Sequence, residues 1–348
     1  MTRTGMRLGR GVILAAAALA IAAGSASAQN YDGKTIRIII PYGPGGTYDK
    51  YGQTFSDHLA KHIPGNPTVI VQHMPGAGGS KAMNWFANAA PKDNAHLIVP
   101  LDNSVVNQLM RPKKMRYDAR QFRWIGSSNQ TNMVMVSRTD IGVNSWEDMK
   151  KAKMICSTSG QGSTGYIVPK LASSLLGFKI KMVTGYKGSS RSILAVEQGE
   201  TNCASFNWLA WSSKVPQWFK PDKDGKVFAK AVLQVGIFRD PDLPADVPML
   251  GDLVKDKMDK AVVNFIAVAG ILGRGLALHP DASDDAVKTL QMAYDKMNAD
   301  QGFASDLQRR KLRLMASTGA DIQKAVAQAV TDASPEVVAR ARKLIYEM

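Results

Sequence analysis

Glycine-rich segments with nearby hydroxyl and carboxyl side chains occur three times in the sequence. They read PYGPGGTYD at 41–49, MPGAGGS at 74–80 and STSGQGST at 157–164. Each follows a predicted strand and leads into a predicted helix, where glycine permits a tight turn and close approach of the backbone to a ligand. Unpaired N–H groups at a helix N-terminus favour an anion. Any one segment fits an ordinary turn, but all three stand at the carboxyl ends of strands, the edge where open α/β sheets bind ligands.

These segments lack the spacings of nucleotide-binding and catalytic motifs. None contains G-x-x-x-x-G-K-[ST], the first has no G-x-G-x-x-G, and Ser163 stands in G-x-x-S-x-G rather than in a nucleophile elbow. His58 and His62 lie four residues apart without the Glu of H-E-x-x-H, which favours a surface pair. No Cys/His cluster has metal-ligand spacing. We therefore predict no catalytic residue, no metal and no cofactor.

Cys156 and Cys203 are the two cysteines of the chain. An exported protein meets oxidising conditions, so this pair is a candidate for one disulfide. Two buried free thiols are the alternative. A Cα separation above ~7 Å would exclude the bridge.

The elements that must position these segments alternate between strand and helix. The run Thr35–Ile40 (TIRIII) is typical of a buried parallel strand. We predict strands at 35–40, 68–71, 96–100, 133–136, 154–157, 180–183 and 203–206, and helices at 48–62, 80–90, 145–151, 166–176, 190–199, 284–297, 301–311, 321–333 and from 335 onward. Ser145 is the expected N-cap of the helix at 145–151, with Asp148 three residues on. Helices between strands predict βαβ units, a parallel sheet and the α/β class.

Residues 1–28 have the features of a secretory signal peptide. Three arginines precede an apolar run at 12–23, and Ala26-Ser27-Ala28 gives the small-x-small cleavage pattern. The run is about a dozen residues, short of the roughly 20 that span a bilayer, which disfavours an uncleaved anchor. We predict cleavage after Ala28 and a periplasmic location. The rest of the 348-residue chain exceeds the usual ~100–200 residues of one domain, so two domains are expected.

The formal net charge of +15 suits nucleic acid, an anionic membrane surface or a small anionic ligand. Acidic residues interrupt the basic groups, and no stripe of alternating aromatic and basic residues appears, so we predict no binding of nucleic acid.

Short motifs along the chain follow the order typical of one family of receptors. Residues 41–49 resemble that family's P-[FW]-x-P-G-G-x-x-D loop, and residues 74–79 its R-P-G-A-G-G segment. Further matches are Asn107, Arg116-Tyr117-Asp118, Gly160-Gln161-Gly162-Ser163, Tyr186-Lys187-Gly188, 199–202 and 243–250. On these motifs the chain resembles the periplasmic receptors of tripartite tricarboxylate transporters, the TctC or Bug family.

The resemblance implies a two-domain α/β periplasmic-binding-protein fold, a type II-like Venus flytrap crossed twice by the chain, with a ligand cleft between the domains. One domain would comprise 29–131 and 266–348, and the other 132–265. The implied function is capture of a small di- or tricarboxylate, or an aromatic carboxylate, for the membrane components of a tripartite transporter, by a monomer without enzymatic activity. The implied ligand-binding residues are Tyr42, Gly45, Gly46, Thr47, Asp49, Gly78, Ser104, Gly160, Gly162, Ser163, Thr164, Asn207 and Trp208.

Within this set we expect the first loop to hold one carboxylate and the third loop another, through neutral donors. Asp49 is expected to fix the first loop rather than to meet an anion. Asn207, Trp208 and Trp211 follow a strand that should end at the cleft, where they would stack on an aromatic ligand or pack between domains.

Departures from the family pattern leave the ligand's identity open. Met74 replaces the usual basic residue, Tyr42 the usual Phe and Asn202 the usual acidic residue, and residues 264–266 and 270–278 replace two family segments. A ligand-sensing protein of a signalling system would use the same binding chemistry. An exported hydrolase or isomerase is the other alternative, but neither a triad nor a metal cluster is visible.

Overall fold

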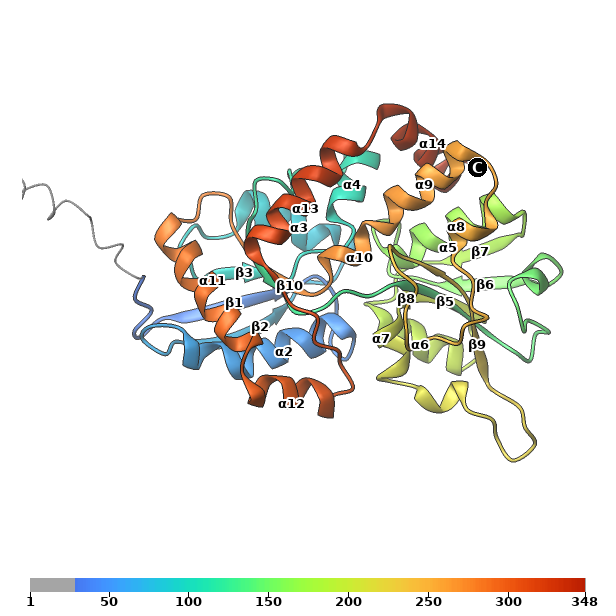
Figure 1. Ribbon diagram of the computed structural model, residues 1–348, viewed down its shortest axis with the longest axis horizontal. Helices are drawn as coiled ribbons and strands as arrows, with labels where there is room; N and C mark the ends of the chain where they lie inside the picture. The colour runs from blue at the N-terminus through green and yellow to red at the C-terminus, as the bar shows by residue number, and fades with distance from the viewer. Residues whose placement is uncertain (1–28, 348) are drawn as a thin grey trace, which may run out of the picture.

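The computed structural model describes residues 29–347, so the predicted signal peptide lies outside the described residues. Its first sheet contains β1 (Thr35–Ile40), β2 (Thr68–His73), β3 (His96–Ile98), β4 (Arg123–Ser127), β10 (Gly275–Leu278) and β11 (Ser317–Thr318). The order is β11-β4-β10-β3-β1-β2. Around it lie α2 (Thr47–Leu59), η1 (Ala60–His62), η2 (Ala77–Gly79), α3 (Ser80–Ala89), α4 (Ser104–Met110), α11 (Asp284–Asn298), α12 (Gln301–Arg309) and α13 (Gly319–Asp332). We call this group the first lobe (Figure 1).

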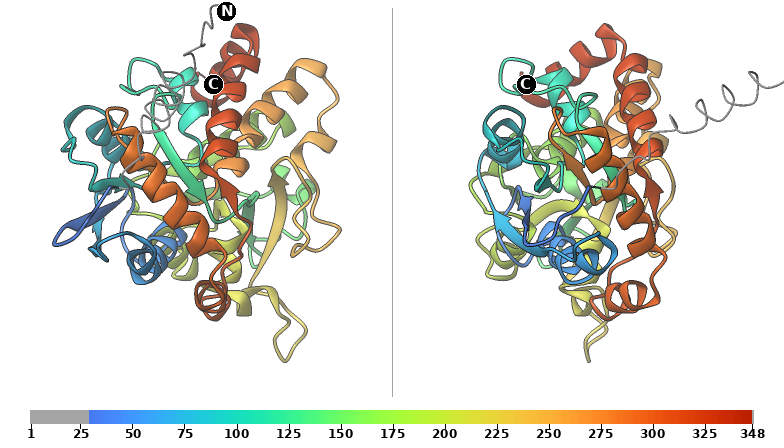
Figure 2. Two further views of the ribbon diagram at one scale, coloured as in Figure 1. Left: turned by 60° about the vertical axis from the view of Figure 1, so that its left-hand side comes forward. Right: turned by 90° about the vertical axis from the view of Figure 1, so that its left-hand side faces the viewer.

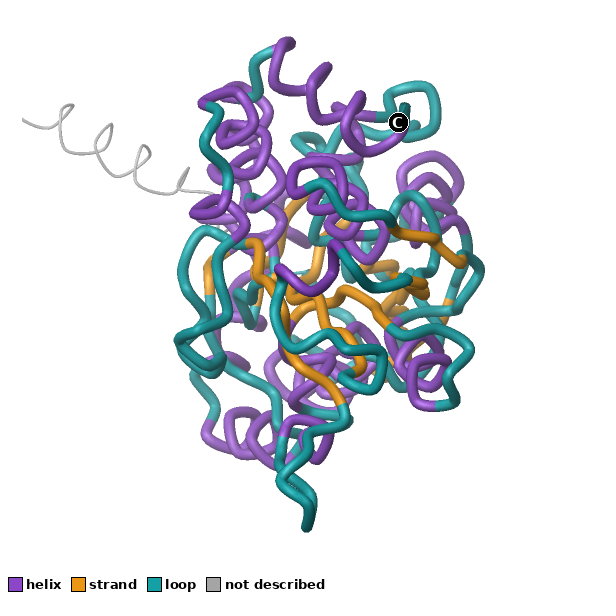
Figure 3. The backbone as a smooth tube through the Cα atoms, turned by 90° about the vertical axis from the view of Figure 1, so that its right-hand side faces the viewer, coloured by secondary structure: helices purple, strands orange, loops and turns teal. Residues whose placement is uncertain are grey.

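The second sheet contains β5 (Met133–Arg138), β6 (Met154–Ser157), β7 (Ile180–Val183), β8 (Cys203–Asn207) and β9 (Ala229–Val235), in the order β7-β6-β8-β5-β9. Its helices are η3 (Glu147–Lys150), α5 (Thr164–Leu176), α6 (Ser189–Glu197), α7 (Trp208–Ser212), η4 (Pro216–Phe219), α8 (Leu250–Leu253), α9 (Lys257–Ala267) and α14 (Pro335–Tyr346). This group is the second lobe, which Figure 3 views with helices on both sides of its strands. The short α10 (Ala269–Leu272) leads from α9 back to β10.

The last helix returns to the second lobe. Val338, Ala341 and Leu344 of α14 are buried in one cluster with Ile167 and Leu171 of α5. The preceding helix α13 belongs to the first lobe, so the chain passes between the lobes once more after α13 (Figures 1 and 2). Among residues 29–347, no helix is both long enough and apolar enough to cross a bilayer.

The alternation of strands and helices through β8 is confirmed, because each of the seven predicted strands is present. The expectation of a parallel sheet is confirmed for part of each sheet and wrong for the rest, since β6 also pairs in parallel with β7 and β8. β1 pairs in parallel with β2 and β3, but β10 pairs antiparallel with β3 and β4. In the second sheet β5 is antiparallel to β8 and β9. Both reversals involve strands that the chain enters from the other lobe, so no crossover helix fixes their direction.

The predicted helix at 145–151 is only a 3₁₀ turn, and Ser145 does not cap it. Instead the Asp148 carboxylate accepts the backbone N–H groups of Asn144 and Ser145 at 2.9 and 3.0 Å. A carboxylate that binds the two preceding amides closes a local turn, which competes with an α-helix.

Helix α2 shows why the helices hold their places on the sheets. Its apolar residues Tyr48, Tyr51, Phe55 and Leu59 recur three or four positions apart, which puts them on one face. All four are buried in the main core of the first lobe, so α2 is fixed against β1 and β2 with its N-terminus at the end of β1. This placement brings the first glycine-rich segment to the carboxyl edge of the sheet.

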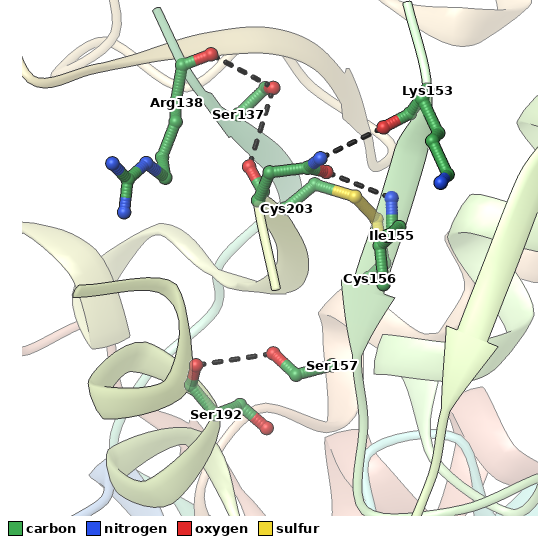
Figure 4. Close-up of a disulfide and its surroundings, with 9 residues drawn as sticks. Ser137, Arg138, Lys153, Ile155, Cys156, Ser157, Ser192 and Cys203 are labelled. Atoms are coloured by element: carbon green, nitrogen blue, oxygen red, sulfur yellow. Dashed lines mark hydrogen bonds between the residues drawn. A yellow bond between two sulfur atoms is a disulfide. The ribbon is translucent and has the colours of Figure 1, made fainter. Parts of the chain in front are cut away.

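A disulfide joins the neighbouring strands β6 and β8 (Figure 4). Cys156 and Cys203 are register partners, and their Cα atoms lie 4.4 Å apart. Both cysteines are fully buried, so the cross-link lies inside the second lobe, directly before the third glycine-rich segment. The alternative of two free thiols does not apply in this structure.

Candidate functional site

A small cavity of about 30 Å³ lies between the two lobes. It is lined by Tyr42, Gly46, Thr47, Tyr48, Asp102, Ser159, Ser163, Thr164, Gly165, Gly188, Ser189, Phe206, Asn207 and Arg274. Most of these residues stand where β1, β3, β6, β7 and β8 end, the edge at which open α/β sheets bind ligands. Ligand pockets usually measure ~300–1,000 Å³, so this cavity is much smaller than a usual ligand pocket.

The first loop is held in shape by Asp49. Its carboxylate accepts the Gly45 N–H at 2.7 Å and contacts His73 Nε2 at 2.7 Å. Gly45 has a φ of +85°, which favours glycine. Gly46 caps α2 without a side-chain hydrogen bond, so the first N–H groups of this 13-residue helix have no side-chain acceptor. The loop therefore presents backbone donors to the cavity, with Asp49 turned to a structural role.

The third loop is closed by its own hydroxyls. Ser163 Oγ lies 2.9 Å from Thr158 Oγ1 and 2.8 Å from the carbonyl oxygen of Gly160. Ser163 is also the N-cap residue of α5, yet its side chain makes no capping bond. The N-terminus of this second 13-residue helix therefore also faces the cavity, from the opposite lobe.

Polar contacts join the lobes around the cavity. Asn207 Nδ2 donates to Thr47 Oγ1 at 3.0 Å. The side-chain amides of Asn103 and Asn107 both donate to the Gly162 carbonyl, at 3.0 and 2.7 Å. We call the contact between these two amides and Gly162 the amide latch.

Glycine is required where the second and third loops meet. Gly78 has a φ of +68°, and a Cβ there would lie 2.7 Å from the Ser163 nitrogen. The backbones of the two lobes therefore approach at a distance that no side chain allows.

A buried ion pair forms part of the cavity wall. Arg274 Nη1 donates to Asp102 Oδ2 at 3.0 Å, and the two residues are 2 % and 4 % exposed. The Arg274 guanidinium carbon lies 3.7 Å from the centre of the Tyr48 ring, and the Tyr48 hydroxyl accepts the Asp102 N–H at 2.9 Å. A buried charge needs such partners, and a cation over an aromatic face gains a further attraction.

These surroundings perturb the titration of the cavity wall. Burial raises the pKa of the Asp102 carboxyl, and the Arg274 guanidinium opposes that rise. Burial acts to lower the pKa of Arg274, yet the nearby Tyr48 and Asp102 outweigh it and raise that pKa, so the guanidinium stays charged. Burial also raises the pKa of Tyr42 well above its usual range, which keeps this phenol a neutral donor. Its hydroxyl donates to the Gly78 carbonyl at 3.0 Å.

Six of the residues expected to bind ligand line the cavity: Tyr42, Gly46, Thr47, Ser163, Thr164 and Asn207. The others lie nearby but do not line it. Gly45 and Asp49 shape the first loop, and Gly78, Gly160 and Gly162 form the contact between lobes. Ser104 is buried at the start of α4, where its carbonyl accepts the Tyr117 hydroxyl.

The tryptophans that follow β8 point away from the cavity. Trp208 is 6 % exposed and packs edge-on against Phe219, with ring centres 5.0 Å apart. Trp211 is fully buried, and its indole N–H donates to the Val134 carbonyl at 3.3 Å. Both rings pack within the second lobe, so in this structure they lie neither against the cavity nor between the domains.

Sequence reasoning missed the ion pair. Arg274 stands in the segment 270–278, which departs from the family pattern, and Asp102 follows β3 without glycine nearby. The available signal was one arginine inside the apolar stretch AVAGILGRGLAL, since a charge in a buried run needs a partner.

The receptor family of tripartite tricarboxylate transporters matches residues 54–335 of this chain. The chain belongs to this family. It is also 27 % identical over 208 residues to a UPF0065 protein of Bordetella pertussis, a match that covers 58 % of this chain and 63 % of that protein. The chain thus spans less than two thirds of the length of the curated relatives it matches.

Solved structures share the fold. The periplasmic binding protein BugD superposes with a TM-score of 0.71 at 16 % identity, covering 90 % of this chain and 98 % of BugD. Rpa4515 of Rhodopseudomonas palustris with adipate gives 0.69 at 16 % identity, over 90 % and 98 %. MatC from the same organism with bound malate gives 0.66 at 17 % identity, over 89 % and 98 %.

By its family, this chain is a receptor of the tripartite tricarboxylate transporter type. Its two lobes have the architecture of periplasmic binding proteins. Within residues 29–347, no group of three or more His, Cys, Asp and Glu side chains is arranged to hold a metal ion.

Proposed function

We propose that this protein captures a small carboxylate in the cavity between its lobes and delivers it to the membrane components of a tripartite transporter. It acts in the periplasm as a monomer, after removal of the signal peptide behind Ala28. The proposed ligand is a di- or tricarboxylate or an aromatic carboxylate. The relatives MatC and Rpa4515 were solved with malate and adipate, which supports the dicarboxylate class.

One observation carries this proposal: the N-termini of two long helices from opposite lobes meet at one cavity. Helices α2 and α5 begin at Thr47 and Thr164, and both residues line it. Because each N-terminus favours negative charge, a ligand with two carboxylates is stabilised from both lobes at once. We assign Tyr42, Gly46, Thr47, Ser163 and Thr164 to direct contact with the ligand.

Two domains that close on the ligand are part of the proposal. They would comprise 29–131 with 266–348, and 132–265, with α14 returning across the boundary as a strap. The closed arrangement is favoured only by contacts that the open form lacks, such as the amide latch and the Asn207–Thr47 hydrogen bond. A ligand that bridges the two helix N-termini adds to these contacts, and its departure leaves them to hold the lobes alone.

A thermal-shift screen of residues 29–348 tests this function. The panel comprises aliphatic dicarboxylates, tricarboxylates, aromatic carboxylates, amino acids and sugars. Ligand at 100 times Kd adds about 2.7 kcal/mol to the free energy of unfolding, which raises Tm by a few degrees. We expect a shift with one carboxylate class and none with sugars. Gly78→Ala is the matched control, because its extra methyl obstructs closure and should reduce the shift.

If no carboxylate raises Tm, and mass spectrometry of the denatured protein finds no co-purified acid, the assignment of the cavity is wrong. If a carboxylate does raise Tm, uptake of that acid into vesicles that contain the transporter's membrane components distinguishes transport from sensing.

A further inference from the structure

Arg274 has hydrogen-bonding capacity that its protein partners do not use. Nη1 donates one hydrogen to Asp102 Oδ2 at 3.0 Å and the other to the Gly273 carbonyl at 2.7 Å. Nη2 makes a single long contact, 3.4 Å to Thr47 Oγ1, and the buried Nε has no partner among the described residues. A guanidinium carries five N–H donors in a planar fork. The edge formed by Nε and Nη2 is therefore largely free.

We propose that the Nε–Nη2 edge of Arg274 binds one carboxylate of the ligand in a bidentate manner and selects ligands that are anionic at that end. This inference rests on the proposed function and deepens it. Arg274 lines the same cavity as the two helix N-termini. The planar fork matches the two oxygens of a carboxylate, and such charge-assisted pairs are roughly twice as strong as neutral hydrogen bonds.

Asp102 and Tyr48 position the guanidinium for this task. Asp102 engages Nη1, on the side opposite the free edge, while the Tyr48 ring covers one face of the plane at 3.7 Å. The guanidinium is thus fixed before a ligand arrives, and little side-chain entropy remains to be lost on binding. A carboxylate–guanidinium–carboxylate arrangement results, in which Asp102 is the resident member and the ligand the exchangeable one.

This proposal departs from the expectation that neutral donors hold the ligand. Burying the charge of a lone arginine would cost free energy, but the pair with Asp102 makes this part of the cavity wall neutral overall. A neutral ligand end would leave the Nε–H without an acceptor, and an ammonium group would face a like charge. Both are disfavoured against a carboxylate.

The test measures binding of malate and of adipate by calorimetry to three variants beside the wild type. Arg274→Gln with Asp102→Asn removes both charges together, so that no uncompensated carboxylate is left buried. Arg274→Lys keeps the charge but loses the fork, and it serves if the double variant does not fold. Arg340→Gln with Asp259→Asn makes the same charge changes at the α14–α9 ion pair, away from the cavity.

We expect the double variant at the cavity to bind about 10- to 100-fold more weakly, as loss of hydrogen bonds to a charged group implies. Arg274→Lys should lie between this variant and the wild type, and the α14–α9 control should bind like the wild type. In ¹⁵N spectra the arginine Nε–H resonance that Arg274→Lys removes should shift on saturation with the bound acid, which a purely structural arginine would not show.

Unchanged affinity in the folded double variant, or an Arg274 resonance that does not move at saturation, would overturn the assignment of Arg274 and leave the proposed function standing. A wild-type protein that binds neither malate, nor adipate, nor any carboxylate of the thermal-shift panel would overturn both.

Discussion

Removal of the disulfide between β6 and β8 should cost the protein about 4 kcal/mol of unfolding free energy. The bridge joins cysteines 47 positions apart. The loop-entropy relation for a closed loop of that length gives a denatured-state entropy loss worth about 4 kcal/mol at 25 °C. Because the bridge lies in the second lobe, the effect should appear in the unfolding of that lobe.

Unfolding by guanidinium chloride, followed by tryptophan fluorescence, is a suitable assay. Trp146, Trp208, Trp211 and Trp218 lie in the second lobe, whereas Trp85 and Trp124 lie in the first, so the signal is weighted toward the lobe that carries the bridge. Three proteins are compared: the oxidised wild type, the wild type under reductant, and Cys156→Ala with Cys203→Ala. Reduction isolates the cross-link, and the double variant adds a small packing loss because both sulfurs are fully buried.

Two results would refute this reasoning. The first is two reactive thiols in the unreduced, denatured protein, which would mean that the bridge does not form. The second is a stability difference below about 1 kcal/mol between oxidised and reduced wild type, which would mean that the denatured second lobe is already compact enough for the bridge to restrict little.

Four further outcomes follow from the site and its supports. Gly78→Ala places a methyl 2.7 Å from the Ser163 nitrogen of the other lobe, so ligand affinity should fall roughly tenfold or more in calorimetry with the fold retained by circular dichroism. Asn103→Ala with Asn107→Ala removes the amide latch, two buried hydrogen bonds worth about 1–3 kcal/mol together. Kd should then rise roughly 5- to 100-fold, and small-angle scattering should show that the open form persists. Ser163→Ala removes the hydroxyl contacts within the third loop and should lower thermal stability by about 1 kcal/mol and weaken binding; unchanged affinity would contradict that loop's role. The ion pair of Asp300 with Lys61, together with the amides at the start of α12, holds the pKa of Asp300 at about 2. The ionised Asp300 therefore stabilises the fold above pH ~4, and this stabilisation is lost as pH falls through 2. The difference in urea midpoint between wild type and Asp300→Asn should shrink over that range.

The parts of the fold that the sequence predicts are those with local signals. The run TIRIII and the glycine-rich segment after it identify β1, the first loop and α2 within 25 residues of chain. Thr47, Ser163 and Thr164 were recoverable for the same reason, because each stands at the start of a helix directly after such a segment. Their residue types and their position at a helix start together indicate ligand contact.

The parts that the sequence does not predict depend on contacts over long distances along the chain. Strand β10 has only four residues and is fixed by antiparallel pairing with β3 and β4, more than 100 positions earlier. The same return of the chain brings Arg274 to Asp102, a contact across 172 positions. No local pattern encodes that meeting, so the charged element of the site emerges only once the mixed sheet is assembled.

The contact between the lobes is polar, which suits the reversible closure that the proposed function requires. Glycine backbones and side-chain amides meet there, and the latch leaves Asn103 Oδ1 and Asn107 Oδ1 buried without a partner among the described residues. Buried acceptors of this kind oppose closure, since in the open form they are hydrated. They therefore offset part of the roughly 1–3 kcal/mol that the two latch hydrogen bonds contribute. In the proposed function, a ligand that engages α2, α5 and Arg274 would supply the rest of the free energy of closure. Its departure would let the lobes separate, which is the behaviour that a carrier requires.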